Sequence, residues 1–122
     1  MKKQILFVCL GNICRSPAAE GVFLNFLKKG GIEDQFIVDS AGTGGWHVGN
    51  KADERMRASA QRRGIIIESL ARQITVNDLM NFDLILTMDN DNLLVVNSLA
   101  KDVNLNVSKK IRPILSYARN NK

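Results

Sequence analysis

The segment "ILFVCLGNICRSP", residues 5–17, combines an apolar run, a short loop and a helix start. Residues 5–9 form a compact apolar stretch, which is typical of a buried strand in a parallel sheet. Ser16 followed by Pro17 predicts a helix N-terminus, with the serine as N-cap and the proline in the first helical position. A strand that passes through a short loop into a helix is the first part of a β-α-β unit, so this segment favours an α/β fold.

The rest of the chain continues this alternation of strands and helices. The first helix is expected to end at Gly30 and Gly31. Helices are further expected at residues 53–63, 76–81 and 90–100, the second of them opened by a Thr75–Asp78 capping box. Strands are expected at 36–39, 82–89 and 110–118, with a Gly-rich loop at 40–50 and Pro113 favouring an edge position for the last strand. This order predicts one α/β domain over residues 1–122, with a parallel sheet and helices on both faces.

Composition excludes several classes of protein. The chain has 122 residues, of which 45% are hydrophobic and 24% charged, as in ordinary globular domains. No apolar run is long enough to span a membrane, and we interpret the N-terminus as a strand rather than a signal peptide. The net charge of +5 is scattered and comes with one Trp and one Tyr, so we expect no nucleic-acid partner. Two cysteines form no disulfide framework, which predicts a cytoplasmic protein.

The loop at residues 9–16 has the composition of an anion site built around a nucleophile. Five residues separate Cys9 from Arg15, and a helix N-terminus closes the loop, so backbone N–H groups can turn inward. Gly11 and Asn12 tolerate the positive φ that such a curl needs. Arg15 can clamp two oxygens of a phosphate, and the amides, the helix dipole and Arg15 together favour a Cys9 thiolate. Ser16 can donate a hydrogen bond to that thiolate.

Other interpretations of the two cysteines are weaker. A Cys-x5-Arg spacing alone arises by chance, but here it stands between an expected strand and an expected helix. Two cysteines and one histidine are too few for a zinc site, so we expect no metal. No cofactor is expected either. A structural Cys9–Cys14 disulfide is not expected in the cytoplasm, whereas a transient one would protect Cys9 from over-oxidation.

Four segments in order resemble the low-molecular-weight protein tyrosine phosphatases. They are "VCLGNICRSPAAEGVF" (8–23), "VDSAGTGGWHVGN" (38–50), "ARQIT" (71–75) and "DLILTMDNDN" (83–92), and the resemblance covers about residues 4–117. It implies a three-layer αβα fold with a four-stranded parallel sheet in the order 2-1-3-4, as in the phosphotyrosine protein phosphatase I-like fold. It also implies a phosphotyrosine protein or an aryl phosphate as substrate, and inorganic phosphate or another oxyanion as a ligand of the loop.

The resemblance also implies roles for individual residues. Cys9 becomes a phosphocysteine, Arg15 binds the phosphate in the transition state, and Ser16 hydrogen-bonds the thiolate. The amides of the phosphate-binding loop come from Leu10, Gly11, Asn12, Ile13 and Cys14, with Asn12 holding the shape of the loop.

Three further positions are expected around the loop. Trp46 falls on the position that contacts the aromatic ring of the substrate, although its sequence context also fits a lid over the core. Asp89 either orients Arg15 or caps the helix that follows it. Ser40 is expected to support the loop from the end of the second strand. The single histidine, His47, is interpreted as a loop residue rather than a base.

One part of the family pattern has no match in this chain. The family uses a general acid in an Asp-Pro-Tyr-type segment near its C-terminus, whereas the only prolines here follow Ser16 and Arg112. The chain ends in the polar sequence "SYARNNK", so we expect a domain that is incomplete at its C-terminus, by truncation or by loss of the acid. A missing acid is expected to reduce the rate by about 10²–10⁴, and most for poor leaving groups. A smaller departure is Ser69, where relatives often carry histidine.

Two alternative functions remain open at the level of sequence. The first is an arsenate reductase of a similar fold, although that chemistry relays a disulfide through late cysteines and this chain has none after Cys14. The second is a non-catalytic module that binds phosphate or a phosphopeptide. Trapping of a phosphocysteine separates the enzyme from the binding module.

Overall fold

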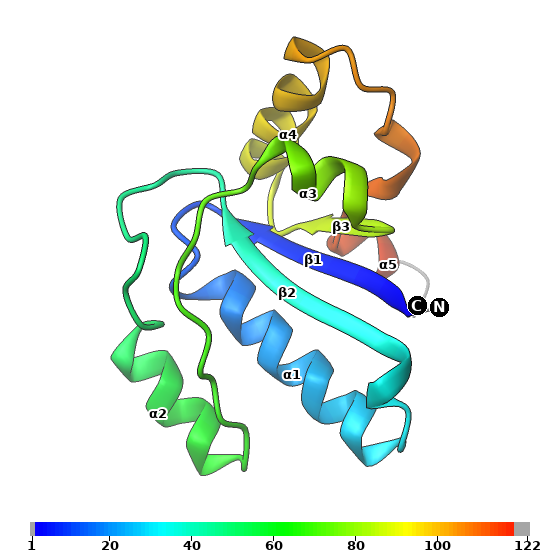
Figure 1. The fold of residues 1–122 in the computed structure, drawn as a ribbon. Coiled ribbons are helices and arrows are strands. Elements are labelled where there is room, and N and C mark those ends of the chain that lie inside the picture. Colours follow the sequence, from blue (N-terminus) through cyan, green and yellow to red (C-terminus); the bar gives the residue numbers. More distant parts are fainter. Residues whose placement is uncertain (1, 119–122) are drawn as a thin grey trace.

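The computed structural model describes residues 2–118 and contains one sheet of four parallel strands (Figure 1). The strands are β1 (Lys3–Cys9), β2 (Phe36–Gly42), β3 (Leu84–Thr87) and β4 (Ile111–Pro113), in the order β2-β1-β3-β4. This confirms the predicted order. In the register, Val8 of β1 lies beside Ala41 of β2 and Thr87 of β3, so the C-terminal ends of these strands meet at one edge of the sheet.

Helices cover both faces of the sheet, which confirms the three-layer prediction. The α-helices are α1 (Arg15–Lys29), α2 (Glu54–Arg62), α3 (Val76–Asn81), α4 (Asn90–Asp102) and α5 (Leu115–Ala118). Two short 3-10 helices lie at Glu33–Gln35 and Ser108–Lys110. In Figure 1, α1 and α2 lie on one side of the sheet, and α3 and α4 on the other.

The two faces have separate apolar cores because successive side chains of a strand point to opposite faces. On one face, Leu6, Val8 and Ile85 pack with Leu79 of α3 and Val96 of α4. On the other, Ile5, Phe7 and Leu86 pack with side chains that include Ala19 and Phe23 of α1. The edge-to-face contact between Phe7 and Phe23, with ring centroids 5.9 Å apart, ties α1 to the central strand.

Three helices begin with a side-chain cap, and the longest does not. Asp53 caps α2, Thr75 caps α3 in the predicted capping box with Asp78, and Asp89 caps α4. The N-cap residue of α1, Cys14, makes no side-chain hydrogen bond, and the first turn of α1 carries no acidic residue. The first N–H groups of α1 are therefore left for another acceptor.

The prediction of a strand over residues 110–118 is wrong. β4 stops at Pro113, and residues 115–118 form the short helix α5. The pairing with β3 ends at Thr87, and the Ser116 hydroxyl donates to the Pro113 carbonyl (2.7 Å), which starts a helical turn. The predicted strand 82–89 is also shorter, because Asp89 caps α4, whereas β2 continues beyond residue 39 to Gly42. Residues 119–122 of the predicted polar C-terminus lie outside the described residues.

No helix in the described part of the chain has the length and hydrophobicity that spanning a membrane would need. Residues 2–118 also contain no group of three or more His, Cys, Asp or Glu side chains arranged to hold a metal ion.

Candidate functional site

The loop at residues 9–16 lies at the switch point of the sheet. It connects the C-terminal end of β1 to the N-terminus of α1, and β1 is the strand with β2 on one side and β3 on the other. Parallel α/β sheets bind ligands outside the carboxyl ends of their strands at such a point. The topology therefore places the predicted loop where a ligand is expected.

The carbonyl groups of the loop are turned outward. Three of them accept hydrogen bonds from backbone N–H groups outside the loop: Cys9 from Thr43 (2.9 Å), Leu10 from Gly44 (2.9 Å) and Ile13 from Asp53 (2.6 Å). In a trans peptide the C=O and the following N–H point in opposite directions. The N–H groups of Leu10, Gly11 and Cys14 therefore point away from these partners, towards the interior of the loop.

Asn12 holds the curl of the loop. It is 2% exposed and has a φ of +58°, which asparagine adopts more readily than most residues. Its side chain accepts a hydrogen bond from the Arg72 backbone N–H (2.9 Å) and donates one to the Ser16 hydroxyl (2.8 Å). The expectation of positive φ is confirmed for Asn12 and is wrong for Gly11, which is instead covered by His47: a Cβ at Gly11 would lie 3.0 Å from the His47 ring.

Cys9 lies on the floor of the loop and is 3% exposed. Its Sγ accepts a hydrogen bond from the Asn12 N–H (3.3 Å) and lies 2.9 Å from the Ser16 hydroxyl. When Cys9 is a thiolate, the hydroxyl is the donor of the second contact. A buried sulfur anion needs such donors around it.

The prediction that Ser16 caps the helix is wrong. The helix starts two residues earlier than predicted, at Arg15, and the fully buried Ser16 side chain contacts Cys9 and Asn12 instead of a backbone N–H of the first turn. A hydroxyl cannot point both towards the sulfur and back over the helix end. The contact with Cys9, which the resemblance implied, is the one that the structure contains.

Arg15 and Asp89 form an ion pair at the edge of the loop. The Arg15 guanidinium donates to one Asp89 carboxylate oxygen (2.7 Å), and the other oxygen accepts the Asn92 N–H (2.8 Å) as the cap of α4. Asp89 therefore contacts Arg15 and caps α4 at the same time. The hydrogen bond with Asp89 raises the pKa of Arg15. The pKa of Asp89 is lowered, mainly by the hydrogen bond from the Asn92 N–H and secondly by the hydrogen bond from Arg15. Both side chains are well exposed, so Arg15 is accessible to a ligand from solvent.

Trp46 stands beside the loop rather than over the core. It is 72% exposed, and its indole lies against Gly44, whose N–H donates to the Leu10 carbonyl. A Cβ at Gly44 would collide with the ring, so the glycine makes this position of the indole possible. The alternative of a lid over the core does not fit such exposure, whereas a surface for an aromatic group does.

The Ser40 side chain makes its hydrogen bond away from the loop. Its hydroxyl donates to Glu20 of α1 (2.6 Å), so it ties β2 to the helix behind the loop rather than to the loop itself. Burial raises the pKa of Glu20, and the hydrogen bond from Ser40 offsets part of this effect. The Ser40 hydroxyl thus contacts α1 and not residues 9–14 of the loop.

Two residues that support the loop were missed by the sequence analysis. Gly42 passes so close that a Cβ there would lie 2.7 Å from the Leu10 carbonyl oxygen, and Arg72 holds Asn12. Both lie inside the segments of family resemblance, but nothing in their local sequence indicates contact with residues 10–12.

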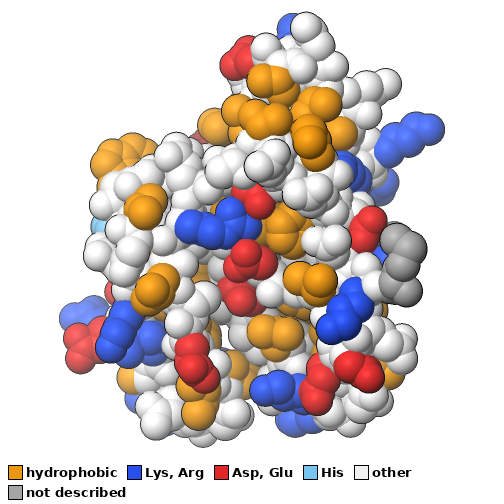
Figure 2. Space-filling view, in the orientation of Figure 1, with side chains coloured by type: hydrophobic (Ala, Val, Ile, Leu, Met, Phe, Trp, Pro, Cys, Tyr) orange, Lys and Arg blue, Asp and Glu red, His pale blue; other side chains and the backbone are white. Residues whose placement is uncertain are grey.

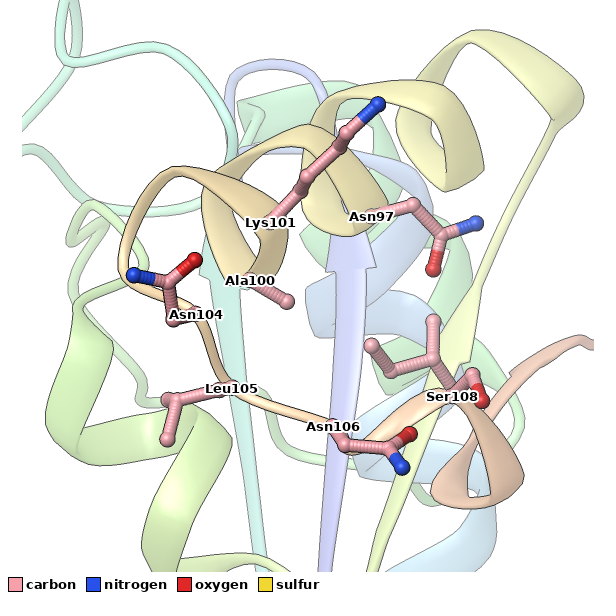
Figure 3. Close-up of a pocket in the computed structure, with 8 residues that line it drawn as sticks. Asn97, Ala100, Lys101, Asn104, Leu105, Asn106 and Ser108 are labelled. Atoms are coloured by element: carbon pink, nitrogen blue, oxygen red, sulfur yellow. The ribbon is translucent and has the colours of Figure 1, made fainter.

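A cavity of about 450 Å³ lies elsewhere, beside the C-terminal end of α4 (Figure 3). Its lining consists mainly of amide, hydroxyl and aliphatic side chains, including Asn97, Asn104, Asn106, Ser108 and Leu105. It contains neither a carboxylate nor a cysteine, so we assign it no chemistry.

The fold and the loop define a class of protein: α/β domains with a buried cysteine in an anion-binding loop at the end of the first strand. A family profile described as low molecular weight phosphotyrosine protein phosphatase matches residues 4–122. The chain belongs to this family, which confirms the resemblance.

Named relatives come from distant organisms. The chain is 52% identical over 95 residues to a low molecular weight phosphotyrosine protein phosphatase of Schizosaccharomyces pombe, an alignment that covers 77% of this chain and 61% of the relative. It is 46% identical over 101 residues to the human protein of the same description, covering 83% and 64%. The chain thus spans less than two thirds of the length of these two relatives.

Solved structures share the fold. The structure of YfkJ from Bacillus subtilis superposes with a TM-score of 0.89 and 42% identity, covering 96% of this chain and 72% of that one. A protein tyrosine phosphatase from Entamoeba histolytica superposes with a TM-score of 0.85 and 39% identity, covering 92% and 70%.

Proposed function

We propose that this protein is a cytoplasmic protein tyrosine phosphatase that hydrolyses aryl phosphate monoesters through a phosphocysteine at Cys9. The proposal rests on the groups that surround the Cys9 sulfur. This sulfur is buried, receives the Asn12 N–H and the Ser16 hydroxyl, and lies below a loop in which the Cys9, Leu10 and Ile13 carbonyl groups accept hydrogen bonds from N–H groups outside the loop. The uncapped N-terminus of α1 adds unused N–H donors and a positive dipole end at the same place.

The residues of the loop divide the chemistry between them. The inward N–H groups and Arg15 bind the phosphoryl oxygens and stabilise the charge that develops on them. The Cys9 thiolate attacks phosphorus, the S–P bond forms, and the bond to the leaving aryl oxygen breaks. The aryl oxide leaves with the electron pair and takes up a proton. Water then attacks the phosphocysteine, the S–P bond breaks, and inorganic phosphate and the thiolate are released.

The proposed substrate class follows from Trp46 and the depth of the site. The exposed indole beside the loop offers a flat apolar surface to the ring of a phosphotyrosine. Cys9 lies below the surface, so the phosphate must reach it on a slim, extended group such as a phenol. The cytoplasmic assignment rests on two cysteines that are both free in the structure. We include no cofactor, nucleic acid or membrane in the proposal.

The test compares the chain with Cys9→Ser on nitrophenyl phosphate, whose leaving group needs little help from an acid. We expect the unmodified chain to hydrolyse it and to yield a phosphocysteine on rapid quenching, detected as an added phosphate mass at residue 9. Cys9→Ser is expected to lose turnover by at least about a thousandfold while still binding inorganic phosphate.

Three outcomes are informative. Residual turnover in Cys9→Ser close to that of the unmodified chain would contradict the assigned nucleophile. Phosphate binding by the unmodified chain with neither turnover nor a trapped phosphocysteine would identify a binding module instead. Arsenate turnover that depends on thioredoxin would favour the reductase.

A further inference from the structure

Arg72 is held by two carboxylates from different elements. It lies on the segment between α2 and α3, which runs beside the end of the edge strand β2, where Gln73 pairs with Gly42 (Figure 1). Its guanidinium makes a two-pronged contact with Asp78 at the N-terminus of α3 (2.8 and 3.1 Å) and pairs with Asp39 of β2 (3.0 Å). Figure 2 shows basic and acidic side chains side by side near the centre of this face of the molecule.

This arrangement fixes the guanidinium firmly. Burial opposes the charged form of Asp78, but the hydrogen bonds from Arg72 and Thr75 outweigh burial and lower its pKa. The planar fork of an arginine matches a carboxylate in both position and orientation. Since Asp39 and Asp78 belong to the sheet and to a helix, the backbone of Arg72 is anchored to the rigid part of the fold.

The backbone of the same residue holds the candidate site. The Arg72 N–H donates to the Asn12 side-chain oxygen (2.9 Å), and the Arg72 carbonyl accepts the Gly42 N–H (2.8 Å). From Asn12 the chain of hydrogen bonds continues to Ser16 (2.8 Å) and from Ser16 to the Cys9 sulfur (2.9 Å). Two intermediate side chains therefore connect the anchored Arg72 backbone to the nucleophile.

We infer that Arg72 is a positioning residue for the nucleophile: its side chain sets the backbone N–H that orients Asn12, and through Asn12 the Ser16 hydroxyl on Cys9. This inference rests on the proposed function, in which Cys9 is the nucleophile. The carbonyl groups of residues 9, 10 and 13 are anchored by other N–H groups, so the phosphate-binding amides stay in place without the guanidinium. Loss of the guanidinium should therefore disturb attack more than binding.

The test uses Arg72→Met, which removes the charge but keeps the backbone N–H, and Arg72→Lys, which keeps one charge for the carboxylates. We expect Arg72→Met to lower kcat on nitrophenyl phosphate by about tenfold to a hundredfold, as small displacements of reacting groups do, with KM nearly unchanged. Arg72→Lys is expected to recover part of the loss. The alkylation rate of Cys9 by iodoacetamide, assigned by fragment masses of the peptide at residues 4–15, should fall in Arg72→Met as well.

Thr75→Ala is the matched control. It removes the Thr75 hydroxyl, which caps α3 and donates to Asp78 (3.1 Å), but keeps the Thr75 backbone N–H on Asp78 (2.8 Å) and both charges of the ion pair. We expect it to lower the melting temperature without changing kcat, measured well below melting. If Arg72→Met likewise lowers only the melting temperature and leaves kcat and the Cys9 alkylation rate unchanged, the residue is structural and the inference is wrong.

The rate of Cys9 alkylation tests this inference separately from the proposed function. A chain that neither binds nor hydrolyses phosphate would overturn the proposed function, while the alkylation rates of Cys9 would still decide whether Arg72 positions Ser16 and the sulfur.

Discussion

At the scale of single residues, Asp89 combines two tasks that are usually separate. One carboxylate oxygen caps α4 through the Asn92 N–H, and the other holds the Arg15 guanidinium. The helix cap fixes the carboxylate, so the arginine is held by a group that cannot swing away. The local sequence cannot distinguish these tasks, because an aspartate before a helix looks the same with or without an arginine 74 residues away.

The two tasks of Asp89 predict different results for two substitutions. Asparagine caps helices about as well as aspartate, whereas alanine does not, so Asp89→Ala should unfold about 1 kcal/mol more easily than Asp89→Asn. Both variants lose the ion pair with Arg15. We expect kcat to fall by about tenfold in each, because the Arg15 guanidinium is no longer held in alignment with the phosphate. Urea unfolding and steady-state kinetics on nitrophenyl phosphate test this. Equal unfolding free energies in the two variants would argue against the role as a cap.

At the scale of elements, the end of β2 and the phosphate loop are built against each other. The strand ends at Gly42, and the next two residues donate to the Cys9 and Leu10 carbonyls. A Cβ at Gly42 would lie 2.7 Å from a backbone oxygen and 3.1 Å from the Gly11 carbonyl carbon. The strand can approach this closely only because the residue at the contact has no side chain.

The contact predicts that Gly42→Ala is destabilising. The added methyl meets backbone atoms, which cannot turn aside as a flexible side chain can, so we expect a loss of about 1–3 kcal/mol in unfolding free energy together with weaker phosphate binding. Gly30→Ala is the matched control, since its nearest neighbour would be 3.7 Å away and its φ is −83°. Thermal unfolding and phosphate titration of both variants test the prediction. A Gly42→Ala variant as stable as Gly30→Ala would contradict the close contact.

At the scale of the whole molecule, a half-buried carboxylate couples folding to pH. Glu20 lies between α1 and β2, where burial raises its pKa above the ordinary value of 4.5. Asp39 raises the pKa further, while hydrogen bonds from Ser40 and Ser69 and the charge of Arg72 lower it. The folded state therefore holds its proton more strongly than the unfolded chain does.

The sign of the pH effect follows from this difference. Between the unfolded and folded pKa values the folded state binds more protons, so the free energy of unfolding decreases as pH rises through that range. We expect the unmodified chain to lose stability relative to Glu20→Gln as pH rises from 4.5, measured by urea unfolding at several pH values. The control Glu33→Gln, at an exposed site, should follow the unmodified chain. Parallel curves for Glu20→Gln and the unmodified chain would contradict the prediction.

Most of the fold could be predicted from local patterns. Apolar runs indicated the strands, the Thr75–Asp78 capping box marked the start of α3, and Gly30 and Gly31 marked the end of α1. The errors are also local in origin. Residues 114–118 have the composition of a strand, but β3 has already ended beside Pro113 and offers no further partner.

Neighbouring residues alone specify the loop: a cysteine at the end of a strand, an arginine six positions later and a helix behind it. These features follow from neighbouring residues, which the chain order specifies directly. The orientation of the sulfur depends instead on contacts between distant segments. Ser16 turns to Cys9 instead of capping its helix because Asn12 holds it, and Asn12 is held by Arg72, 60 residues further along the chain. Such contacts exist only once the sheet has brought distant segments together, so no local pattern specifies them.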